Sequence, residues 1–262
     1  MSPRLAVLIL SLCVAAGLVA CGAPAQNREV RTDVDQTDGD RRANVRMDLA
    51  QGYFASGQFN TALDELKQAL LIKPEMREAV ILRGLVYAAM GETQLAEESF
   101  RRTLTLYPGD PDALHNYGWF LCQQQRWAAA DAQFEQALAQ PSYRAPQRSL
   151  LARGVCEARS GRMKAAETSL SRAFELDAGN PAIAVNLAEV LYRNGEAERA
   201  RFYVKRVNAS AELANAQSLW LQLRIERRLG NTATVEDLAE QLRKRYRGTP
   251  ETQALDLGRF DD

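Results

Sequence analysis

Residues 77–108, REAVILRGLVYAAMGETQLAEESFRRTLTLYP, carry two helix-like patterns separated by a glycine. On either side of Gly91, apolar or small side chains recur every three to four residues, which is the spacing of an amphipathic helix. Gly84 has no side chain, so a second helix can approach closely there, with Phe100 filling the remaining volume. The stretch therefore predicts a helical hairpin with a small-to-large fit. The other positions of the two stripes are Val80, Tyr87, Ala96 and Leu104.

The same pattern recurs at a spacing of roughly 34 residues, which is the period of a tetratricopeptide repeat. Gly118 and Gly154 take the place of Gly84 in the next two units. Because each unit buries its apolar face only against its neighbours, such repeats stack in series. We therefore predict an all-α fold, a right-handed superhelical solenoid of about six tetratricopeptide (TPR) helical hairpins. The predicted units are 43–76, 77–110, 111–144, 147–180, 181–214 and 216–249.

Residues 1–20 are predicted to be a signal peptide, because their apolar run is shorter than the about 20 residues that a membrane-spanning helix needs. The run ends in Leu-Val-Ala-Cys at Cys21, which resembles the lipobox of bacterial lipoproteins. That resemblance implies cleavage before Cys21 and lipidation of its thiol. Gly22, where Asp is absent, implies sorting to the outer membrane. The alternative is an ordinary cleaved signal followed by a chance cysteine.

Two polar segments flank the repeats. Residues 21–42 carry few large apolar side chains, so they bury too little surface to offset the entropy of ordering them. We predict a flexible tether there. Residues 250–262 place Leu255 and Phe260 among polar residues, and we expect this tail to cover the last hairpin, since the end of a solenoid needs a cap.

Composition sets aside several classes of function. Lys plus Arg and Asp plus Glu both total 33, so no net charge attracts nucleic acid. His115 is the one histidine, and the sequence has no His-Glu-x-x-His zinc motif, phosphate-binding glycine loop, Gly-x-Ser-x-Gly elbow or Cys-x-x-Cys pair. We therefore predict a monomer that binds a protein partner, without enzyme activity, cofactor or metal.

The first helix of each unit is expected to line a concave surface, by analogy with the geometry of TPR domains. For any one large side chain there, the alternative is packing against a neighbouring helix. Asn116 and Asn186 favour the groove, because an unpaired amide is costly inside a core. The predicted partner-binding groove comprises Met47, Phe54, Ile81, Leu85, His115, Asn116, Trp119 and Asn186, and the same strip includes Leu82, Leu151, Val155, Tyr192 and Trp220.

Cys122 and Cys156 fall near the ends of the first helices of the third and fourth units, which should lie side by side. An exported protein meets an oxidising compartment, which favours a disulfide between the two helices. Two buried free thiols are the alternative.

Three segments are more specific than the repeat pattern and indicate one family. HNYGWFLC at 115–122, PSYRAP at 141–146 and RIERRLG at 224–230 resemble the type IV pilus biogenesis and stability lipoproteins, the PilF/PilW family. This resemblance implies a non-enzymatic pilotin. Such a protein is lipid-anchored on the periplasmic face of the outer membrane, and it promotes localisation and multimerisation of the pilus secretin, on which twitching motility depends. A general TPR lipoprotein scaffold for outer-membrane protein assembly or peptidoglycan synthesis is one alternative, and a periplasmic enzyme is another.

Overall fold

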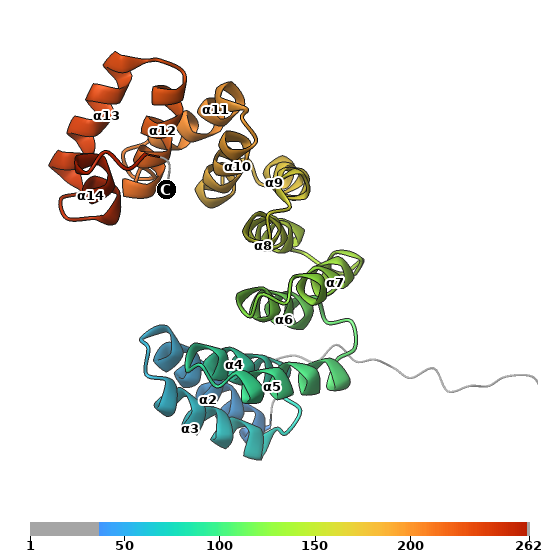
Figure 1. Ribbon diagram of the computed structural model, residues 1–262. Helices are drawn as coiled ribbons and strands as arrows, with labels where there is room; N and C mark the ends of the chain where they lie inside the picture. The colour runs from blue at the N-terminus through green and yellow to red at the C-terminus, as the bar shows by residue number, and fades with distance from the viewer. Residues whose placement is uncertain (1–36, 261–262) are drawn as a thin grey trace, which may run out of the picture. The chain divides into compact units, whose positions relative to one another are not determined.

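The computed structural model describes residues 37–260, and every regular element in this range is a helix (Figure 1). The predicted signal peptide, Cys21 and most of the predicted tether lie outside the described residues. The chain divides into two units, Met1–Arg41 and Arg42–Asp262, and the second unit contains the repeats. The helices are α2 (Asp38–Ala55), α3 (Phe59–Ile72), α4 (Arg77–Ala89), α5 (Thr93–Leu106), α6 (Pro111–Gln123), α7 (Trp127–Leu138), α8 (Pro146–Arg159), α9 (Met163–Leu176), α10 (Pro181–Arg193), α11 (Ala197–Asn208), α12 (Ala216–Arg228), α13 (Thr232–Arg245) and α14 (Pro250–Asp256).

The repeat unit packs as hairpins in series. From α4 to α13, each first helix pairs with the helix that follows it, and the second helix of one hairpin contacts the first helix of the next. The first helices also contact one another directly, α4 with α6, α6 with α8, α8 with α10 and α10 with α12. Buried side chains of α2, α3 and α4 form one core cluster, which joins the first hairpin to the second. The predicted all-α solenoid of TPR hairpins is therefore confirmed.

The small-to-large fit within the hairpins is present in three consecutive units. A Cβ atom added to Gly84 would lie 2.9 Å from the ring of Phe100, and one added to Gly118 would lie 2.9 Å from the ring of Phe134. In the last of these units, a Cβ atom added to Gly154 would lie 2.5 Å from Leu170 Cγ. Both phenylalanines are fully buried. Because packed cores leave no room for an added methyl group at such distances, the glycines set how closely the two helices approach.

A left-handed residue ends the first helix of each hairpin. At the end of α4, Gly91 has φ 78°, and the next residue donates a hydrogen bond back to the Tyr87 carbonyl. This is the Schellman arrangement, in which glycine is favoured because it lacks a Cβ atom. The third hairpin makes the same turn with Gln125 at φ 58°, where a side chain is present in the left-handed region.

The start of α2 differs from the prediction. The helix begins at Asp38, within the segment 21–42 that the sequence analysis assigns to a tether. Thr37 and Asp40 explain the start, because the Asp40 amide donates to the Thr37 hydroxyl and the Thr37 amide donates to the Asp40 carboxylate. These two bonds form a capping box, which satisfies amides that the first turn would leave unpaired.

The C-terminal tail covers the last hairpin. α14 contacts both α12 and α13, and Leu255 joins the buried cluster of these helices. Phe260 stacks on Trp220 with 5.4 Å between ring centroids, and Arg224 Nε donates to the Phe260 carbonyl at 3.0 Å. The tail therefore closes the apolar end of the repeats, as a solenoid cap does.

Candidate functional site

The N-terminal residues of the predicted groove belong to the core. Met47 is 4% exposed and Ile81 is 7% exposed, so neither presents its side chain to a partner. Phe54 and Leu85 are half-buried and pack against the cluster of α2, α3 and α4. The packing alternative therefore applies to these four residues, because two are buried and the other two pack against a buried cluster.

His115 and Asn116 lie in the interface between α6 and α8. His115 Nδ1 is hydrogen-bonded to Ser149 Oγ at 2.9 Å, and the Asn116 side-chain oxygen accepts from Arg148 at 3.1 Å. Burial, with a smaller contribution from Arg148, lowers the pKa of His115 to about 3. The imidazole is therefore neutral and internally bonded at neutral pH. These two predicted groove residues instead hold neighbouring repeats together.

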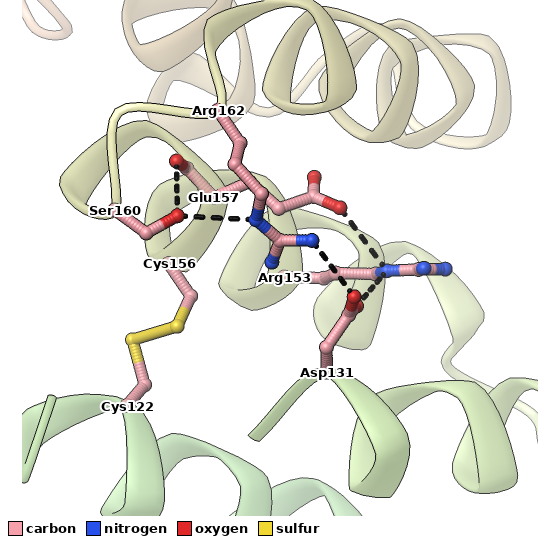
Figure 2. The surroundings of a disulfide bond; sticks show 7 residues. All are labelled: Cys122, Asp131, Arg153, Cys156, Glu157, Ser160 and Arg162. Atoms are coloured by element: carbon pink, nitrogen blue, oxygen red, sulfur yellow. Dashed lines mark hydrogen bonds and ion pairs between the residues drawn. A yellow bond between two sulfur atoms is a disulfide. The ribbon is translucent and has the colours of Figure 1, made fainter. Parts of the chain in front are cut away.

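A disulfide joins Cys122 of α6 to Cys156 of α8, with 5.8 Å between the Cα atoms (Figure 2). Beside it, Arg153 Nε lies 2.6 Å from Asp131 and 3.3 Å from Glu157. Burial raises the pKa of Glu157, while Ser169 and Arg153 oppose the rise. The bond and this ion-pair cluster fix the junction of the third and fourth hairpins covalently and electrostatically.

An open cavity of about 410 Å³ lies between α8, α10 and α12. Asn186 lines it, and within residues 37–260 its amide donates only to the Ala182 carbonyl of its own helix, at 2.8 Å. Val155 and Trp220, both half-buried, supply apolar surface. The cavity thus lies on the first helices that the sequence analysis selects, but in the C-terminal half of the repeats.

Arginines and two glutamates, Glu189 and Glu251, set the charge of this cavity. Glu189 accepts a 2.6 Å bond from Arg193 and lies 3.7 Å from Arg224. Arg159 stands over the ring of Trp119, with 5.3 Å from its guanidinium carbon to the ring centroid. Trp119 is therefore placed at the α8 edge of the cavity by a cation–π contact. Apolar surface, amides and guanidinium groups together suit a peptide better than a small apolar ligand.

The arginines were missed because the sequence analysis weighed large apolar side chains and amides. A usable signal was present, since Arg159 and Arg193 fall at the same place in successive units, as the last residue of the first helix. Cations are favoured there by the helix dipole, which makes the position inconspicuous as a functional one.

Within residues 37–260, no group of three or more His, Cys, Asp or Glu side chains could hold a metal ion. None of the described helices combines the length and the apolar character that crossing a membrane requires. The cavity between α8, α10 and α12, which we call the arginine groove, is the candidate functional site.

Family models described as tetratricopeptide repeat match residues 47–111, 121–181 and 158–223. The type IV pilus assembly protein PilF of Pseudomonas aeruginosa PAO1 is 27% identical over 255 residues, which cover 97% of this chain and 98% of that protein.

Two solved structures extend the comparison. The crystal structure of PilW, described as a widely conserved type IV pilus biogenesis factor, has a TM-score of 0.75 and 29% identity, covering 81% of this chain and 97% of that one. The structure of Pseudomonas aeruginosa PilF has a TM-score of 0.73 and 25% identity, covering 85% of this chain and 100% of that one. The chain is therefore a tetratricopeptide-repeat protein of the PilF/PilW type.

Proposed function

We propose that this protein is a scaffold of type IV pilus biogenesis that acts by binding rather than by catalysis. The observation that carries the proposal is the extent of the likeness. PilF, a type IV pilus assembly protein, matches nearly the whole of both chains. A likeness confined to a few repeats would point only to the fold, because TPR hairpins serve many unrelated proteins.

The finer form of the proposal is a pilotin that promotes localisation and multimerisation of the pilus secretin in the outer membrane. Lipid on Cys21 would hold the protein at the periplasmic face. One acyl chain binds a membrane only weakly, at about 0.8 kcal/mol per buried methylene, so several chains would be needed for a firm anchor. The tether behind Cys21 would let the repeats reach a partner.

The arginine groove is the surface on which the secretin would bind. It combines half-buried Trp220 with the amide of Asn186 and with guanidinium groups, and half-buried Trp119 contacts Arg159 at its edge. Interface energy concentrates in a few aromatic and arginine anchors. Trp119→Ala should therefore weaken secretin capture by about 2 kcal/mol or more, without changing helicity.

A groove-filling variant tests the proposal. Asn186→Trp places a bulky side chain in the cavity at a half-buried helical position whose amide bonds only to its own helix. Arg172→Trp is the matched control, because Arg172 is an exposed residue of α9 that does not line the groove. In a deletion strain, Asn186→Trp should give fewer secretin multimers and less twitching, whereas Arg172→Trp should restore both.

Three results would count against parts of the proposal. Secretin multimers at parental levels after deletion of the whole gene would refute the pilotin function. Normal multimers with a folded Asn186→Trp variant would remove the groove from the mechanism. Unchanged outer-membrane fractionation and lipid labelling of Cys21→Ser would refute the anchor.

A further inference from the structure

A cluster of three arginines stands at the end of α12. Together with Tyr192, the side chains of Arg224, Arg227 and Arg228 line a second cavity of about 330 Å³. Arg227 and Arg228 are exposed, while Arg224 is largely covered, with 13% of its side chain accessible. The residues come from neighbouring first helices, α10 and α12, so the cluster is held by the packing of two repeats.

Aromatic rings hold these guanidinium groups in place. The guanidinium carbons of Arg224 and Arg228 lie 5.0 and 5.5 Å from the Tyr192 ring centroid, and that of Arg227 lies 4.1 Å from the Phe260 centroid. Stacking of this kind leaves N–H groups at the edge of the guanidinium plane able to donate, although Arg224 Nε already donates to the Phe260 carbonyl. The donors are thus oriented before any ligand arrives, which lowers the entropy lost on binding.

Positive charge in the cluster is largely uncompensated. Within residues 37–260, neither Arg227 nor Arg228 has a carboxylate at ion-pair distance, and Arg224 has only Glu189 at 3.7 Å. Glu226 lies on the same turn but is buried, and it accepts a bond from Asn231 and lies 3.9 Å from Arg201. Other arginines of the repeats do have a close carboxylate, such as Arg153 with Asp131 at 2.6 Å.

The cluster continues the arginine groove, because Arg224 lines both cavities. An extended segment lying over Asn186 and Trp220 would therefore reach Arg227 and Arg228 at its end. We propose that the three arginines bind a run of Asp or Glu side chains in an extended peptide segment of the partner protein. This inference rests on the proposed function in taking the groove to hold a partner segment.

An acidic peptide fits better than an anionic membrane. The groove beside the cluster carries Glu189 and Glu251, which would repel a negatively charged surface. Lys plus Arg and Asp plus Glu are equal in number, so no overall field draws the chain to such a surface. Carboxylates on a narrow peptide can instead pair with guanidinium forks two N–H groups at a time.

Selection from a random peptide library displayed on phage tests the inference, with the full-length purified chain immobilised in detergent. The selected peptides should be enriched in Asp and Glu beside apolar residues. The best peptide, labelled with fluorescein, should bind the parent chain with an affinity that falls as salt rises. Arg227→Glu/Arg228→Glu should weaken that binding at least about tenfold, and replacing Asp and Glu in the peptide by Asn and Gln should do the same.

Arg144→Glu/Arg172→Glu is the charge-matched control. Both residues are exposed and line neither cavity, so this variant should bind the peptide as the parent does. Circular dichroism and thermal unfolding confirm that both double variants are folded. Arg227→Lys/Arg228→Lys should keep part of the affinity, since charge remains while the planar fork is lost.

Four outcomes would overturn the inference. The first two are selected peptides without enrichment in Asp and Glu, and equal weakening of peptide binding by the two charge-reversal variants. The third is arginine-dependent binding of the protein to phosphatidylglycerol vesicles but to no peptide. The fourth is peptide binding that is seen only with Asp261→Asn/Asp262→Asn. The last outcome would make the end of this chain the ligand. Failure of the pilus phenotype leaves the peptide measurements intact, so the two proposals can fail separately.

Discussion

Gly154→Ala probes the close approach of α8 and α9 with a single methyl group. A Cβ atom at this position would lie 2.5 Å from Leu170 Cγ and 3.3 Å from the Ala166 carbonyl oxygen. Leu170 is fully buried, so its Cγ cannot move away without displacing the surrounding side chains. The substitution must therefore strain either the leucine or the spacing of the two helices.

The size of the effect is a difference of two opposing terms. Replacing glycine by alanine inside an unobstructed helix stabilises it by about 0.5–1 kcal/mol. Overpacking of a filled core costs typically about 1–3 kcal/mol, and the 2.5 Å distance indicates the upper part of that range. We expect Gly154→Ala to lower the free energy of unfolding by about 1–2 kcal/mol and the Tm by roughly 2–8 °C.

Gly52→Ala is the matched control. Gly52 is an exposed residue in the interior of α2, and a Cβ atom there would meet nothing within 4 Å. The same chemical change should therefore raise the free energy of unfolding by about 0.5–1 kcal/mol. Thermal unfolding followed by circular dichroism gives both shifts, and Gly154→Ala/Leu170→Ala should lose less stability than the two single losses added together. A Tm for Gly154→Ala at or above the parent value would refute the close-approach reasoning.

Three further predictions concern stability. Gln125→Gly should raise the free energy of unfolding by about 1 kcal/mol, because φ 58° strains a residue with a side chain; a lower Tm would contradict this. Cys122→Ser, or reduction of the disulfide to Cys156, should lower the free energy of unfolding by about 2–4 kcal/mol in urea titrations. Equal unfolding midpoints of the oxidised and reduced protein would argue against a stabilising disulfide. Because the pKa of His115 falls from 6.5 unfolded to about 3 folded, its contribution to stability is lost as pH drops through that interval, by at most about 1.4 kcal/mol per pH unit. His115→Gln should flatten the measured pH dependence there, and an unchanged slope would contradict the assignment.

The fold could be predicted from sequence because its determinants are local and repeated. Gly84 and Phe100 lie within one hairpin, and their equivalents recur at the same spacing. The contact recognised in one hairpin therefore predicts the corresponding contacts in the others. The early start of α2 was missed for a different reason. Its first turns are polar, and only the Thr37 and Asp40 capping pair marks the helix. Apolar periodicity cannot reveal a helix end that side-chain caps define.

The site was predicted only in part because exposure depends on how repeats cover one another. Ile81 and Asn186 both lie on first helices, yet Ile81 is buried while Asn186 lines the cavity. Asn116 was favoured for the groove because its amide needs a partner, and Arg148 of the next hairpin supplies that partner. A pairing between residues of different repeats has no local sequence pattern, so the sequence could not distinguish these cases.

The junction between the third and fourth hairpins connects stability to the arginine groove. A longer linker joins α7 to α8 than joins α5 to α6, so the chain itself constrains the position of α8 less. The Cys122–Cys156 disulfide and Ser149, which is bonded to both His115 and Tyr143, supply the missing constraint. Because Trp119 belongs to α6 and Arg159 to α8, the same constraint sets the edge of the groove. Covalent and polar contacts at this junction therefore hold the partner surface in a fixed shape before a partner binds.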